Sequence, residues 1–182
     1  MGVFRKFPRT FWVANTIELF ERWAWYGFFM LFANYLTGSS DMGGLEFTQS
    51  QKGILMGVGT GILYFLPVLT GAIADRYGYK KVLALAFVIY TSAFILLPMF
   101  STFTGVFLMY LYLALGAALF KPIISATIAK TTTDETASIG FGIYYMMVNI
   151  GAFFGPMVTL LFKGSSNLVF YVSAGIIALN FV

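Results

Sequence analysis

Five long apolar runs and the start of a sixth, separated by short polar or turn-rich breaks, organise the chain. A helix that crosses the roughly 30 Å hydrocarbon core of a bilayer needs about 20 mostly apolar residues. The runs predict an all-α, polytopic membrane protein in which residues 1–182 form one transmembrane bundle. The predicted spans lie near residues 11–37, 51–74, 82–100, 105–129, 137–162 and 168–182, and we expect the last to be truncated because it ends without a polar flank.

The composition agrees with this pattern and excludes a soluble domain. Hydrophobic residues make up 59% of the chain and charged residues 10%, with 21 Phe, which is more apolar surface than a 182-residue globule can bury. The net charge of +4 does not indicate a nucleic-acid partner, because the cations form short clusters between the apolar runs. The lipid bilayer is the expected partner instead.

The distribution of Lys and Arg predicts the orientation of the chain. Cytoplasmic segments of membrane proteins carry an excess of cations. If the N-terminus is cytoplasmic, the inner segments hold seven cations and the outer segments two, so we expect a protein integral to the plasma (inner) membrane with this orientation. The inner cations are Arg5, Lys6, Arg9, Arg76, Lys80, Lys81 and Lys130, and the outer ones are Lys52 and Lys163.

Two absent residue types limit the chemistry. The chain has no Cys, which excludes a thiol nucleophile or a zinc-thiolate site, and no His, the side chain that titrates most readily near neutral pH. No nucleophile–base pair, metal cluster or phosphate-binding loop is visible, so we expect no enzyme, no cofactor and no metal. Any proton that the protein carries must travel on a carboxylate.

The first predicted span carries an unusual polar stripe near its middle. A charge at the bilayer centre costs about 2.5–3.5 kcal/mol even on the lenient insertion scale, so three on one helix demand a reason. At about 100° per residue the polar positions fall within an arc of roughly 140°, which we expect to face the bundle interior. The stripe consists of Asn15, Glu18, Glu21, Arg22, Trp25 and Tyr26.

The spacing of these charges predicts how they pair. Glu18 and Arg22 are four residues apart, in the favourable acid-first order for a helical ion pair, which leaves Glu21 unmatched. Lys121 in the fourth span is positioned to offset it, and the four charges then sum to zero. Such a group could be a structural network that holds two helices together. A substrate or proton pathway is the more natural interpretation of four charges within a small membrane bundle.

Glycines and prolines occur inside the predicted spans. Small residues at intervals of four let helices approach closely, and prolines kink them. Generic packing explains any single glycine, whereas a proline in each of three spans favours helices that bend during a working cycle. The residues in question are Gly53, Gly57, Gly61 and Pro67 in the second span, Gly116 and Pro122 in the fourth, and Gly151, Gly155 and Pro156 in the fifth.

The segment between the second and third spans carries a motif. Gly71, Asp75, Arg76, Gly78 and a following basic residue match the Gly-x-x-x-Asp-Arg-x-Gly-x-Lys/Arg signature of the major facilitator superfamily, at the loop where that superfamily carries it. By itself the segment is equally compatible with a tight turn anchored by cations. The resemblance implies a conformational or gating role for these residues.

Three further motifs resemble those of the proton-dependent oligopeptide transporters, a branch of that superfamily. They are Glu-x-x-Glu-Arg with an aromatic-Tyr-Gly tail in the first span, Phe-Lys-Pro at 120–122, and Phe-Gly-Ile-Tyr-Tyr…Val-Asn-Ile-Gly at 141–151. The resemblance covers essentially the whole chain. The chain departs from the family pattern at two places. It has Trp25-Tyr26 where the family usually has two Tyr, and the stretch after Lys-Pro is less polar than in the family. The resemblance therefore favours the family rather than a particular substrate.

This resemblance implies roles for individual residues. Protons are coupled to substrate through Glu18, Glu21, Arg22 and Lys121, and the last two meet the carboxylate of a small peptide. The rest of the peptide site is lined by Trp25, Tyr26, Tyr64 and Asn149.

The expected fold is the N-terminal six-helix bundle of a major facilitator, built as two inverted three-helix repeats. A C-terminal bundle, absent from this chain, closes a midplane site that alternates between the two sides of the membrane. The expected function is proton-coupled symport of di- and tripeptides, with peptide, protons and the second bundle as partners. Two alternatives stay open: another major facilitator carrier, for a sugar or a drug, and a membrane scaffold that transports nothing.

Overall fold

The computed structural model describes residues 3–162 and 165–181, and six α-helices account for most of them. The helices are α1 (Arg9–Thr37), α2 (Gln49–Tyr77), α3 (Tyr79–Leu96), α4 (Phe103–Lys130), α5 (Ala137–Leu161) and α6 (Ser166–Ala178). Short 3₁₀ turns precede α1, follow α1, and extend α3 and α6. The prediction of an all-α fold is confirmed, and the six helices coincide with the six predicted segments, with ends that differ by at most a few residues. Lys163, counted among the outer cations, and Val182, the last residue of the sixth span, lie outside the described residues.

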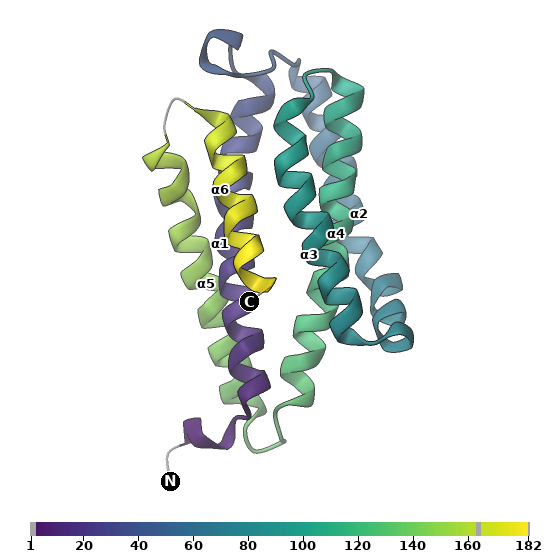
Figure 1. Ribbon diagram of the computed structural model, residues 1–182, viewed down its shortest axis with the longest axis vertical. Coiled ribbons are helices and arrows are strands. Elements are labelled where there is room, and N and C mark those ends of the chain that lie inside the picture. The colour runs from purple at the N-terminus through teal and green to yellow at the C-terminus, as the bar shows by residue number, and fades with distance from the viewer. Residues whose placement is uncertain (1–2, 163–164, 182) are drawn as a thin grey trace.

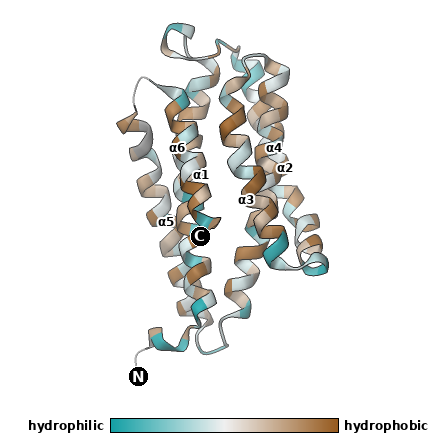
Figure 2. Cartoon of the chain, in the orientation of Figure 1, coloured by the Kyte–Doolittle hydropathy of each residue, from teal (hydrophilic) through white to brown (hydrophobic). Residues whose placement is uncertain are grey.

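Within the described part of the chain, four helices are long and apolar enough to cross a membrane: α2, α3 with its 3₁₀ extension, α4 and α5. Helix α1 has 29 residues, ample for a span, but its charged stripe makes it less apolar. Helix α6 has 13 residues and continues as a 3₁₀ turn to Phe181. Hydrophobic residues dominate the helices, whereas hydrophilic residues gather mainly at the ends of the bundle (Figure 2).

The packing of the helices has an internal symmetry. Helix α1 packs mainly on α5 and α6, and α4 packs mainly on α2 and α3. Helices α3 and α6 contact each other, as do α1 and α4, so the pattern is unchanged when α1, α2 and α3 are exchanged for α4, α5 and α6. Figure 1 shows the two groups side by side, α5–α1–α6 and α3–α4–α2. This is the arrangement expected for two inverted three-helix repeats.

A cluster of aromatic rings joins the two groups. Phe28 and Phe32 from α1 contact Phe94 of α3, Tyr110 of α4 and Phe170 of α6, and all five side chains are at most 1% exposed. Offset and edge-to-face ring pairs of this kind add to the favourable burial of apolar area. The cluster therefore fixes α1, α3, α4 and α6 as the centre of the bundle.

Helices α2 and α5 lie at the margins and leave apolar surface open. On α2, the large side chains of Tyr64, Phe65 and Val68 are 76–81% exposed. The glycines at 53, 57 and 61 have no heavy atom of another element within 4 Å of an added Cβ. The expected close helix approach is thus absent at these three glycines within the described chain.

The turn between α2 and α3 is shorter than predicted. The sequence suggested a polar break from Asp75 to Lys81, but Asp75 and Arg76 belong to the last turn of α2, and Lys80 and Lys81 belong to the first turn of α3. A single residue, Gly78, separates the two helices, with φ of 94° and ψ of 135°. Side chains with a Cβ rarely adopt this conformation, so the motif's glycine is required by the backbone.

Pro122 in α4 is compensated by a side chain of α2. Proline has no N–H, so the carbonyl of Ala118, four residues earlier, loses its helical donor. The hydroxyl of Thr70, which is buried, donates to this carbonyl at 2.6 Å. A Cβ added to Gly71 would lie 3.7 Å from the Cβ of Pro122, so α2 also runs close to the proline ring. The hydrogen bond thus joins the first repeat to the second beside Lys121.

Replacing Thr70 by Val is expected to lower the stability of the bundle by about 1–3 kcal/mol, the typical cost of leaving a buried carbonyl without a donor. Thermal unfolding in detergent would measure the change. Thr127→Val is the matched control, because the hydroxyl of Thr127 donates only to Ile123, within its own helix. Equal stability of the two variants would contradict the proposed importance of the bond between α2 and α4.

Candidate functional site

Four charged side chains meet in the middle of the bundle, three from α1 and one from α4. Glu18 and Glu21 are fully buried, whereas the side chains of Arg22 and Lys121 are 15% and 39% exposed. Lys121 Nζ donates to Glu18 Oε1 at 2.7 Å. Arg22 donates to both oxygens of Glu21, from Nε at 2.5 Å and from Nη2 at 2.7 Å. The predicted neutral group of two acids and two bases is therefore present.

The predicted ion pair between Glu18 and Arg22 is present, but it is not the shortest contact of either residue. Helical spacing favoured Glu18 with Arg22 and left Glu21 for Lys121, but the main pairs are Glu21 with Arg22 and Glu18 with Lys121. Arg22 Nε keeps only a longer contact to Glu18, at 3.5 Å. The guanidinium forms a planar fork that matches both oxygens of one carboxylate, which favours the two-bond contact with Glu21. The Lys ammonium is a point donor and needs only the single oxygen that Glu18 offers.

Two tyrosines complete the group, and the sequence predicted no role for either of them. The hydroxyl of Tyr90, on α3, donates to Glu21 Oε1 at 2.5 Å, and Tyr90 is fully buried. Lys121 Nζ lies 5.3 Å from the ring centroid of Tyr144 on α5, within cation–π range. One oxygen, Glu18 Oε2, is buried without a hydrogen-bond partner among the described residues. The charged group therefore contacts α1, α3, α4 and α5.

A cavity of about 400 Å³ opens beside these charges. Its wall combines the two cations with aromatic and small apolar side chains of α1, α2 and α4. Five of the six residues predicted to bind substrate line it, and Leu63, Pro67 and Ala117 complete the wall. The five are Arg22, Trp25, Tyr26, Tyr64 and Lys121.

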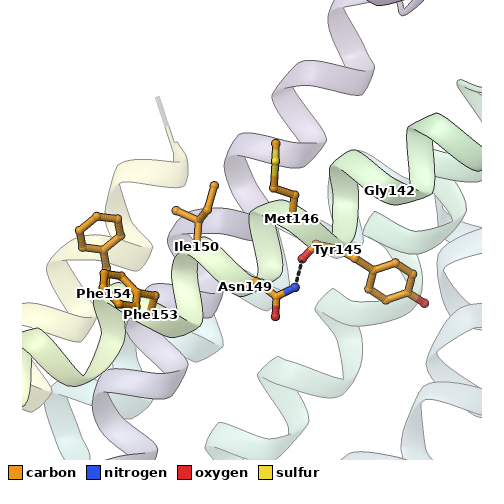
Figure 3. A pocket seen from close by; sticks show the side chains of 7 residues that line it. All are labelled: Gly142, Tyr145, Met146, Asn149, Ile150, Phe153 and Phe154. Atoms are coloured by element: carbon orange, nitrogen blue, oxygen red, sulfur yellow. Dashed lines mark hydrogen bonds between the residues drawn. The ribbon is translucent and has the colours of Figure 1, made fainter.

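The sixth predicted residue, Asn149, lies elsewhere. Its side-chain amide donates to the carbonyl of Tyr145 one turn earlier, at 2.8 Å, and the residue is exposed. It lines an open groove to which α5 alone contributes side chains, together with Tyr145, Met146 and Phe153 (Figure 3). The structure therefore does not bring Asn149 into the cavity that holds the other five residues.

Two glycines of α5 hold that helix against the charged part of α1. A Cβ added to Gly151 would lie 2.7 Å from both the Cβ of Arg22 and the carbonyl oxygen of Leu19. A Cβ on Gly155 would lie 2.7 Å from the backbone nitrogen of Gly27 and the Cβ of Tyr26. The expectation that glycines four residues apart allow close approach is confirmed here. Neither position has room for a side chain.

Gly151→Ala is expected to destabilise the bundle by about 1–3 kcal/mol, because the added methyl group overpacks the contact with α1. The displacement would also move Arg22. Gly142→Ala, in the same helix, is the control: nothing lies within 4 Å of its Cβ, so the change should be neutral or slightly stabilising. Unfolding temperatures of the two variants check this, and a Gly151 variant as stable as the control would refute the packing argument.

Asp75, one of the predicted gating residues, belongs to a separate polar cluster at one end of the bundle. Asp75 accepts a hydrogen bond from Tyr79 at 2.9 Å, and Lys130 of α4 donates to the same tyrosine hydroxyl at 2.8 Å. Lys130 lies 4.0 Å from Asp75. Both charged side chains are largely exposed, so the ion pair itself contributes little to stability. The cluster does connect the α2–α3 turn to the end of α4.

Comparison with known proteins agrees with this geometry. The model of the Major Facilitator Superfamily matches residues 13–182. Dipeptide and tripeptide permease A of Escherichia coli is 28% identical over 158 residues, which cover 85% of this chain and 31% of the permease. The uncharacterized transporter YclF of Bacillus subtilis is 24% identical over 154 residues, covering 83% of this chain and 31% of that protein.

Solved structures extend the likeness to three dimensions. A POT family transporter in complex with 5-aminolevulinic acid superposes with a TM-score of 0.87 at 26% identity, covering 95% of this chain and 37% of the transporter. The peptide transporter POT in complex with sulfate gives a TM-score of 0.86 at 25% identity, with 95% and 36% covered. This chain thus spans about a third of the length of the proteins it matches. It belongs to the Major Facilitator Superfamily, and within that superfamily it is similar to the proton-dependent oligopeptide transporters.

Proposed function

We propose that this chain forms the N-terminal half of a proton-coupled symporter of di- and tripeptides. The observation that carries the proposal is the placement of Arg22 and Lys121: each is held by a buried carboxylate and each also lines the cavity. A cation in this position can choose between the protein's own carboxylate and that of a bound peptide. The cavity volume of about 400 Å³ lies in the range typical of small-molecule sites.

Protonation would control this choice. Glu18 Oε2 has no hydrogen-bond partner among the described residues, so it is ready to accept a proton. A neutral Glu18 no longer holds Lys121 by charge, and a neutral Glu21 likewise releases Arg22. The released cation then pairs with the carboxylate of the peptide. Deprotonation on the other side of the membrane returns the cation to its original partner and expels the substrate.

A second six-helix bundle is part of this proposal. Tyr64 and Phe65 of α2 and Phe153 of α5 are 66–81% exposed, and the cavity is open in the described chain. The relatives are about three times as long as this chain. We expect the second bundle to cover the α2 and α5 face, to close the cavity, and to alternate its access by rocking.

Uptake into proteoliposomes tests the proposal. The protein, together with its second bundle, should accumulate a labelled dipeptide when the outside is acidic, and a protonophore should abolish the accumulation. Other major facilitator carriers would share the α2–α3 turn but have no need of the two carboxylate–cation pairs. Accumulation of a sugar or a drug in place of peptides would favour such a carrier, and the absence of any uptake would favour a scaffold.

The proposed orientation, with a cytoplasmic N-terminus, gives a topology prediction. Because residues 1–182 contain no Cys, a single cysteine introduced among them is the one thiol of this part of the protein. Cysteine in place of Asp41, in the exposed α1–α2 loop, should react with an impermeant thiol reagent added to intact cells. Cysteine in place of Asp134, in the exposed α4–α5 loop, should react only after the cells are opened. The reverse pattern would invert the orientation.

A further inference from the structure

The two buried carboxylates differ in their hydrogen-bond partners. Glu18 accepts one short hydrogen bond, at Oε1, and its other oxygen is unpartnered among the described residues. Glu21 accepts bonds at both oxygens, from Arg22 and from Tyr90, and is fully buried. Both hydrogen-bond partners of Glu21 are therefore donors, and a protonated Glu21 needs one of them to become an acceptor.

Of the two partners of Glu21, only Tyr90 can reverse its role. A guanidinium has five N–H donors and no acceptor, so Arg22 can never receive a hydrogen bond from a protonated carboxyl group. A phenolic hydroxyl both donates and accepts, and its hydrogen turns about the C–O bond without moving the ring. The ring of Tyr90 is fixed by buried aromatic neighbours, Phe94 and Phe120, so the oxygen stays beside Glu21 while the hydrogen turns.

We propose that Tyr90 is a positioning residue that stays hydrogen-bonded to buried Glu21 in both of its protonation states, so that the carboxyl group keeps a partner when Arg22 is released. In the ionised state the Tyr90 hydroxyl donates to Glu21 Oε1. When a hydronium ion delivers a proton, the Glu21 carboxylate becomes a carboxylic acid and water is left. The hydroxyl of Tyr90 then turns and accepts the new O–H. Tyr90 keeps its own proton throughout, and Arg22 loses the negative charge that held it.

The surroundings of Glu21 are consistent with this role. The other charged groups near it are Glu18 and Arg22 on α1 and Lys121 on α4, and the titratable group that α5 contributes is Tyr144, beside Lys121. Among the described residues, Arg22 and Tyr90 are the hydrogen-bond partners of the Glu21 carboxylate. Tyr90 is therefore the partner that can remain hydrogen-bonded to Glu21 after protonation.

Infrared difference spectroscopy tests the proposal on the full-length protein in lipid vesicles. Acidification should produce a carboxylic C=O stretching band that is missing in Glu21→Gln. In Tyr90→Phe, which keeps the ring, this band should move to higher frequency because the acid has lost a hydrogen-bond partner.

Tyr110→Phe is the matched control. Tyr110 is equally buried, at 1% exposed, and packs among the rings of Phe28 and Phe32 on α1. It should leave the frequency of the Glu21 band unchanged. The proposal is overturned if the Glu21 band is unaltered in Tyr90→Phe, if Tyr110→Phe shifts it equally, or if wild-type protein shows no Glu21 band at all.

The inference rests on the proposed function in treating Glu21 as a proton carrier, but the two can fail separately. If the wild-type protein shows no proton-driven peptide uptake and the band still shifts in Tyr90→Phe, the transport proposal fails and the role of Tyr90 stands. If uptake is proton-driven and the band does not respond to Tyr90→Phe, the role of Tyr90 fails alone.

Discussion

Gln in place of Glu18 or Glu21 is expected to abolish proton-driven accumulation of peptide while exchange of labelled for unlabelled peptide continues. Gln has nearly the shape of a protonated Glu, so the variant resembles a transporter locked in its protonated state. Each coupled proton can drive about tenfold accumulation per pH unit, because 1.4 kcal/mol corresponds to a factor of ten. The accumulation ratio is the peptide concentration inside the vesicle divided by that outside. Without the proton drive, we expect this ratio to fall to about one in either variant.

Uptake and counterflow assays in the same proteoliposomes measure both activities. Glu135→Gln serves as the control, because this acid is 81% exposed and pairs only with Lys6 at the end of the bundle. It should transport like the wild type. If both Glu18→Gln and Glu21→Gln still concentrate peptide against its gradient, the protons travel by another route.

Replacing Lys121 by Gln should show whether the charged group takes part in transport or only stabilises the bundle. In Lys121→Gln, buried Glu18 keeps only the 3.5 Å contact with Arg22. Breaking a buried ion pair by removing one partner costs about 3–5 kcal/mol, and we expect the lower end because Lys121 is partly exposed. The variant should reach the membrane at reduced stability and should fail to accumulate peptide.

Combining Lys121→Gln with Glu18→Gln distinguishes the two interpretations, because Glu18 is the carboxylate that Lys121 contacts. The double variant should regain most of the lost unfolding temperature, since no charge is left unpaired. Under the transport proposal it should still not accumulate peptide, because the proton acceptor and the cation that responds to it are both gone. Recovery of proton-driven uptake in a stable double variant would make the pair a structural bridge only.

The helices and the central charges could be predicted from the sequence because both depend on local patterns. Runs of apolar residues set the spans to within a few residues, and the mid-span position of Glu18, Glu21, Arg22 and Lys121 marked them as an interior group. The α2–α3 turn was placed correctly, but its length was overestimated, because charged residues there belong to helix ends that extend beyond the apolar core.

Features that depend on side-chain conformation or on contacts between distant helices could not be predicted in the same way. The i, i+4 rule chose Glu18 for Arg22, yet the rotamer of Arg22 brings its guanidinium onto Glu21. Tyr90 stands in an ordinary apolar helix with no motif around it, so only the packing of α3 on the bundle reveals its bond to Glu21. Equal spacing likewise gave no sign that Gly151 and Gly155 of α5 meet α1 closely while Gly53, Gly57 and Gly61 of α2 meet nothing within 4 Å.

The bond from Thr70 to the Ala118 carbonyl has a consequence for how the protein can change over evolution. Pro122 creates the unpaired carbonyl and Thr70 satisfies it, so Thr70 cannot be exchanged freely while Pro122 remains. A chain that replaces Pro122 recovers a backbone N–H for Ala118 and frees position 70 to become apolar. A chain that first loses the Thr70 hydroxyl leaves the buried carbonyl of Ala118 without a hydrogen-bond donor. The order of substitution is therefore constrained: the proline must go before the threonine.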